Sequence, residues 1–140
     1  MAGSDTFSTY ITPTGLAAAD PNGICLTQTP GSASNLTING ALQSGGVATL
    51  VPARNVTITS GGSSETGKTF TITGTATDGT TVTEAIAGPG GSATVSTTAL
   101  FETVTQVAVD AATAGAVTVG SGTTVNQVVF AGRTRLRGIY

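Results

Sequence analysis

Apolar and polar residues alternate along most of this chain with a period of two. In 55–59 and 69–73, valine, isoleucine or phenylalanine alternates with threonine, which is typical of β-strands with one buried face. Similar runs lie at 36–38, 47–51, 103–109, 116–119, 124–130 and 135–140. Turn signals rich in glycine and asparagine separate them. The pattern predicts an all-β fold, an antiparallel β-sandwich or jelly roll of about eight strands with extended terminal segments.

The length of the chain fits one domain. Its 140 residues are enough for a single buried core. We expect an N-terminal extended arm at 1–22, the β-sandwich at 23–132 and a C-terminal basic strand or arm at 133–140. A helix of a turn or two would fit only at 15–20, between two prolines.

The Asp78-Gly79 turn predicts a hairpin with a testable register. A two-residue loop would place the apolar residues of 69–73 and of 82–86 on opposite faces. A three-residue loop at 77–79, with Gly79 in the left-handed conformation, places them on the same face. We therefore predict the three-residue loop.

That register has a consequence for Glu84. It brings Glu84 opposite Ile72 on the apolar face, where an unpaired carboxylate is costly. Arg54 lies an even number of positions before the apolar residues of 55–59, so it should share their face of the strand. We therefore expect a structural ion pair between Arg54 and Glu84. Alternatively, Glu84 lies near a strand end and reaches water.

Charged residues are scarce, at 9% of positions against about 25% in a typical domain. The formal net charge of −2 lacks the basic excess of nucleic-acid-binding domains. No apolar run approaches the roughly 18 residues of a membrane span, and the first residues do not resemble a signal peptide. We predict no nucleic-acid partner, no membrane partner and a protein made in a cytoplasm.

The parts of common catalytic and metal sites are missing from the sequence. There is no histidine and one cysteine, so histidine-dependent triads and structural zinc sites cannot form. The carboxylates are scattered singly, and lone Cys25 is expected to be a buried, inert thiol. We predict no enzymatic activity, no cofactor and no metal.

One segment matches a phosphate-binding motif. Residues 62–69 fit G-x-x-x-x-G-K-[ST], which binds phosphate where the loop opens onto a helix N-terminus. Here 70–77 alternates as a strand does, and no amphipathic helix is present to connect a parallel sheet. We therefore predict that the match arises by chance.

The C-terminus is the most basic part of the chain. An extended strand would project its three alternating arginines from one face, where they could dock on an acidic partner surface. Alternatively, they protect an edge strand from uncontrolled pairing. A second docking arm is expected at 4–14. The predicted partner-binding residues are Arg133, Arg135, Arg137, Phe130, Leu136, Ile139, Tyr140, Phe7 and Tyr10.

Six segments combine this alternation with turn glycines. They are VTITS at 56–60, TFTITGTATDG at 69–79, VTE at 82–84, GPG at 88–90, FETVTQV at 101–107 and ATAGAVTVG at 112–120. Together they cover roughly 54–120 and resemble a module found in small structural proteins of tailed bacteriophages. The resemblance implies a non-enzymatic β-sandwich that is part of the virion.

On that basis we expect a capsid decoration or cement protein that binds the phage head in many copies and stabilises it. Its partners would be the major capsid protein or another virion protein, and itself as a trimer or dimer. It would be assembled in the host cytoplasm and located in the virion. A tail, neck or fibre-base component and an Ig-like adhesion module are the alternatives.

Overall fold

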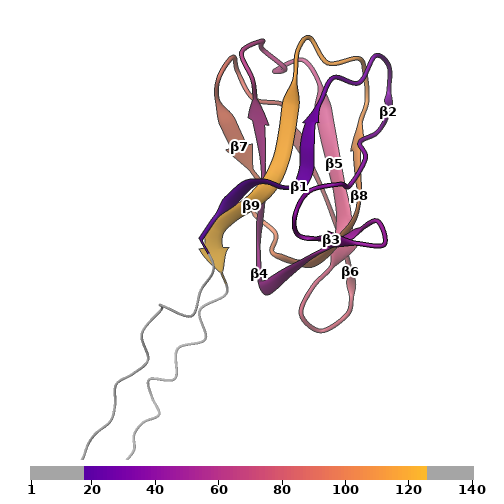
Figure 1. Cartoon of the computed structure of the whole chain (residues 1–140), viewed down its shortest axis with the longest axis vertical. Coiled ribbons are helices and arrows are strands. Elements are labelled where there is room, and N and C mark those ends of the chain that lie inside the picture. The colour runs from indigo at the N-terminus through magenta and orange to yellow at the C-terminus, as the bar shows by residue number, and fades with distance from the viewer. Residues whose placement is uncertain (1–17, 126–140) are drawn as a thin grey trace, which may run out of the picture.

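A computed structural model describes residues 18–125, and this part of the chain is all-β (Figure 1). Every strand pairing in it is antiparallel, as predicted. The strands are β1 Asp20–Gln28, β2 Ser34–Asn35, β3 Gln43–Ser44, β4 Val47–Ser60, β5 Thr69–Thr75, β6 Thr81–Ala87, β7 Thr94–Ser96, β8 Phe101–Val109 and β9 Val117–Val125. The main strand order is β1-β9-β4-β8-β5-β6.

Strand β4 contributes to both layers of the sandwich. Its first half pairs with β8, where Ala48 is opposite Val104. Its second half pairs with β9 on one side and β7 on the other. The ladder to β8 shifts between Thr49 and Arg54, a stretch that contains Pro52, which has no N–H to donate. One layer is therefore β6, β5, β8 and the start of β4, and the other is β7, the end of β4, β9 and β1.

The core lies between these layers and is formed by the alternating apolar residues. The inward side chains of β5 and the second half of β4 are completely buried, as the period of two predicts. Burial of each large apolar side chain contributes about 1.5–3 kcal/mol. The core residues are Ile24, Cys25, Leu36, Ala48, Leu50, Val56, Ile58, Phe70, Ile72, Phe101, Val104, Val107, Val109, Val117 and Val119.

The hairpin between β5 and β6 has the predicted three-residue loop. The Ala76 amide donates to the Thr80 carbonyl at 2.9 Å, and Gly79 has a φ of 85°, a conformation that glycine adopts without strain. Ile72 lies opposite Glu84. The partly buried Val82 and Ile86 of β6 pack on the core, so the register inferred from the apolar pattern is confirmed.

Two strands run through breaks that the sequence predicts, and four strands, β1, β2, β3 and β7, were not predicted. The strand expected at 36–38 is not formed, because β2 ends at Asn35. β4 is continuous through the gap between the runs predicted at 47–51 and 55–59, and β9 through the gap between those predicted at 116–119 and 124–130. β1 begins at Asp20, inside the range assigned to the N-terminal arm and in place of the short helix. Gly120 explains two of these differences: a Cβ there would overlap the Asp20 carbonyl and Pro21, so this glycine permits close contact between β1 and β9.

Candidate functional site

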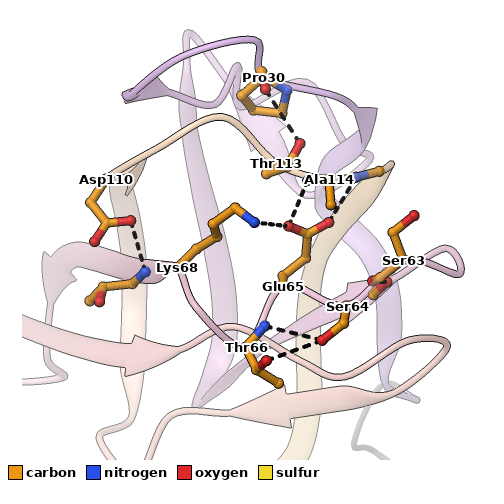
Figure 2. A network of polar contacts seen from close by, with 12 residues as sticks. Pro30, Ser63, Ser64, Glu65, Thr66, Lys68, Asp110, Thr113 and Ala114 are labelled. Carbon is orange, nitrogen blue, oxygen red and sulfur yellow. Dashed lines mark hydrogen bonds and ion pairs between the residues drawn. The ribbon is translucent and has the colours of Figure 1, made fainter.

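A network of polar contacts lies where loops meet at the start of β9, and we call it the Glu65 junction (Figure 2). The Glu65 side chain is completely buried. Its two carboxylate oxygens accept hydrogen bonds from the amides of Ala114 and Gly115, each at 2.8 Å. The Lys68 ammonium lies 3.3 Å from the same carboxylate. One side chain thus connects the loop before β5 to the loop before β9.

Backbone contacts extend this junction to the neighbouring loops. The Glu65 amide donates to the Pro89 carbonyl at 2.7 Å, and Thr113 donates to the Pro30 carbonyl at 3.0 Å. Asp110 accepts from the Thr69 amide at 2.9 Å. Four connecting segments are therefore held together by contacts that are distant in sequence.

The surroundings of Glu65 favour its ionised form. Burial alone would raise the pKa of Glu65. The hydrogen bonds from Ala114 and Gly115 and the nearby Lys68 ammonium together lower this pKa by more than burial raises it, so the net pKa is below the ordinary value. Because both oxygens are engaged and shielded from solvent, the carboxylate is arranged to fix loops and has no access to a substrate.

Acidification is expected to destabilise the fold through this group. A carboxylate whose pKa is lower in the folded state stabilises the protein fully above its unfolded pKa, about 4.3 for glutamate. That stability is lost as the pH falls through the lowered folded pKa. Unfolding free energies at pH 7 and pH 3 should therefore differ more for the natural protein than for Glu65→Gln. Equal losses in the two proteins would contradict this role of Glu65.

The phosphate-binding pattern at 62–69 forms part of this junction. It is followed directly by β5, a strand, as predicted, so there is no helix N-terminus to bind an anion. Lys68, the lysine of the pattern, faces Glu65 (Figure 2). The segment closes a loop junction.

Arg54 and Glu84 do not form the predicted ion pair. Both Glu84 oxygens accept backbone hydrogen bonds, from the amides of Thr98 at 2.8 Å and Ala99 at 2.7 Å. Within residues 18–125, the ion pair closer than 4.0 Å joins Lys68 and Glu65. The prediction treated the strand of Arg54 as a neighbour of β5, whereas β8 lies between them.

Arg54 instead lies at the end of the sandwich where the described chain begins and ends. It is only 3% exposed and donates to the carbonyls of Ala18 at 3.2 Å and Gly122 at 3.4 Å. It also lines a hollow of about 130 Å³ with Asp20 and Val51, which is smaller than the roughly 300 Å³ of the smallest typical ligand sites. We infer that Arg54 anchors the ends of β1 and β9.

A second, shallow groove of about 380 Å³ crosses β1, β9, β4 and β7. Hydroxyl groups dominate its lining, among them those of Thr57, Thr59, Thr94 and Ser96. Among its lining residues within 18–125 there is neither a charged side chain nor an aromatic ring. It therefore lacks the apolar walls and convergent charged groups of a typical small-molecule site.

Cys25 is a core residue, as predicted. It is completely buried on β1 opposite Val119, and burial raises the pKa of its thiol to about 12. A thiol in this state is a poor nucleophile.

The predicted partner-binding residues lie outside the described residues, so their contacts stay predictions. The structure does show where their segments connect. Asp20, the first residue of β1, pairs with Ser121, midway along β9, and the start of β1 and the end of β9 project from the same end of the sandwich (Figure 1). Residues 1–17 and 126–140 therefore connect to one end of the molecule.

No group of three or more cysteine, aspartate and glutamate side chains within 18–125 could hold a metal ion. In the same range, no helix is long and apolar enough to cross a membrane. Comparisons of the chain with protein-family models, with curated proteins and with solved structures found no match.

Proposed function

We propose that this protein is a non-enzymatic structural protein of a bacteriophage virion, and specifically a capsid decoration protein that binds the head shell in many copies. The observation that carries the proposal is that residues 1–17 and 126–140 connect to the same end of the sandwich, at the start of β1 and the end of β9 (Figure 1). A folded body with both terminal segments connected at one end suits attachment to a larger surface, because terminal segments can add strands or apolar anchors to a partner.

The distribution of charge supports the same proposal. Residues 18–125 contain six carboxylates and two basic side chains, whereas 126–140 contain three arginines and no carboxylate. Arginine binds carboxylates with paired hydrogen bonds, so this segment suits an acidic surface on the shell or on another copy. The scarcity of charge elsewhere leaves little repulsion between closely packed neighbours.

The proposed mechanism is interfacial. Each copy would contact neighbouring capsid subunits through its two terminal segments, and binding by one segment would raise the effective concentration of the other. The shell would gain resistance to internal pressure from many such contacts. No bond would be made or broken.

Particle composition tests this proposal. In phage particles purified from cells that produce the chain, quantitative mass spectrometry should find it in copy numbers comparable with those of the major capsid protein. Reversing the charge of Arg133, Arg135 and Arg137 to glutamate should weaken particle binding about tenfold or more. Thr71→Glu, on the outward face of β5, controls for added negative charge and should bind normally.

Two outcomes would contradict the decoration role. A small fixed number of copies per particle would favour the tail, neck or fibre-base alternative. Absence from purified particles would exclude a virion role altogether.

A further inference from the structure

Strand β6 is an open edge of the sandwich. It pairs only with β5. Ala76 bonds to Thr80 at one end of this ladder, and Gly88 bonds to Lys68 at the other. Because hydrogen-bonded positions alternate in an antiparallel ladder, Thr81, Thr83, Ala85 and Ala87 direct their N–H and C=O groups away from β5.

The four outward-directed residues of β6 have no backbone hydrogen bond to another part of the described chain. Their side chains are small, uncharged and exposed. Proteins usually protect such an edge with lysine, proline, a bulge or a covering segment. The charged residue of the strand, Glu84, has its carboxylate engaged by the 98–99 amides.

The other end of the strand order is covered. The carbonyl of Ile24 in β1 accepts hydrogen bonds from Asn39 at 3.1 Å and from Gly40 at 2.9 Å, and Leu42 donates to Gly23 at 2.8 Å. The segment 39–42 therefore closes the edge of β1. Strand β7 spans only three residues. The long accessible edge among the described strands is that of β6.

We propose that β6 accepts the segment 133–138 of a second copy of this chain as an additional strand. Acidic side chains lie at the Thr81 end of the edge: Asp78 is in the hairpin loop, and Glu102 precedes Thr103, which pairs with Thr75. The donated segment carries the opposite charge. This proposal deepens the proposed function, and rests on it, by naming the partner of one docking segment.

The alternation of the donated segment matches the two faces of β6. If the three arginines lie on the outward face beside the threonines and alanines, Leu136 lies on the inward face. There it meets Val82 and Ile86, which are half-buried and pack on the core. Strand addition would thus combine backbone hydrogen bonds, one apolar contact and charge complementarity.

The position of β9 favours a second copy over the same chain as the donor. β9 and β6 lie far apart in the strand order, with β4, β8 and β5 between them. The end of β9 projects away from the sandwich (Figure 1). Donation from one copy to the next is a head-to-tail contact, and such contacts close into rings when the rotation permits, in agreement with the expected dimer or trimer.

Hydrogen exchange on the purified full chain tests the proposal without any phage particle. The amides of Thr83 and Ala85 should be protected at high protein concentration and exchange rapidly on dilution to monomer. Ala85→Pro removes one outward N–H and leaves the ladder to β5 intact, because proline is tolerated on an open edge. It should weaken self-association about tenfold, the effect of roughly one net hydrogen bond. Ala85→Val retains the N–H and is the matched control.

A second variant tests the same contact without any substitution in β6, so its result does not depend on whether Ala85→Pro folds. Leu136→Asp lies outside β6 and should also abolish the concentration-dependent protection. Protection that persists in the monomer would mean that the chain's own segment occupies the edge, and would overturn the proposal. So would equal association by Ala85→Pro and Ala85→Val. A protein that decorates particles but stays monomeric would refute strand addition alone.

Discussion

Replacing Glu65 by alanine is expected to lower the free energy of unfolding by about 3 kcal/mol. The substitution removes the acceptor of two charge-assisted hydrogen bonds from Ala114 and Gly115, each worth about 1.5–3 kcal/mol. It also leaves a void in place of a completely buried side chain. In a domain of this size the melting temperature should fall by roughly 10 °C. Chemical and thermal unfolding followed by circular dichroism would measure both quantities.

Lys68→Met is the informative comparison. The Lys68 ammonium pairs with the same carboxylate but is partly exposed, and the amides of Ala114 and Gly115 satisfy both carboxylate oxygens without it. If the carboxylate acts mainly by binding backbone amides, this variant should retain most of the stability. A loss as large as that of Glu65→Ala would instead mean that the ion pair dominates the junction.

Local alternation was sufficient to predict the class of fold and one complete hairpin. The apolar residues of 69–73 and 82–86 share a face with a three-residue loop and lie on opposite faces with a two-residue loop, so the alternation predicted the loop at 77–79. This inference needs no knowledge of distant neighbours, because the pairing is set within one turn. The same reasoning identified the buried faces of β4 and β5.

Contacts between distant segments could not be read in this way. Pro21 and Gly23 are typical of a turn, yet they lie in β1, because this strand crosses β9 at Gly120. Glycine occurs both in turns and where two backbones approach closely, and the sequence alone does not distinguish these two roles. The prediction of an ion pair for Arg54 was wrong for a related reason. Alternation along a strand shows which residues share a face, but it does not show which strands lie next to one another in the sheet.

The role of Glu65 was missed although a signal was present. It is one of only seven carboxylates, and it lies between turn glycines immediately before a strand. Its partners are the amides of residues 114 and 115, about fifty positions away, and amides have no signature in the sequence. The phosphate-binding pattern singles out Lys68, whereas Glu65 makes the hydrogen bonds that connect the two loops.

Replacing Gly120 by valine is expected to separate β1 from β9. A side chain at this position would overlap the Asp20 carbonyl and the Pro21 backbone, and neither can move without displacing the strand. Overpacking of this kind costs about 3 kcal/mol when backbone must shift. Gly31→Val is the matched control, because no atom lies within 4 Å of a Cβ built there, and it should leave stability nearly unchanged.

The single cysteine reports directly on this separation. Cys25 is completely buried on β1, and burial raises its pKa to about 12, so a thiol reagent should label the natural protein and Gly31→Val only slowly under native conditions. In Gly120→Val, displacement of β1 exposes the thiol and should accelerate labelling about a hundredfold, the factor that corresponds to roughly 3 kcal/mol of easier opening. Labelling as slow as in the control would show that β9 accommodates the valine. Because β1 follows residues 1–17 and β9 precedes 126–140, fast labelling would also show that Gly120 holds together the two strands to which these segments connect.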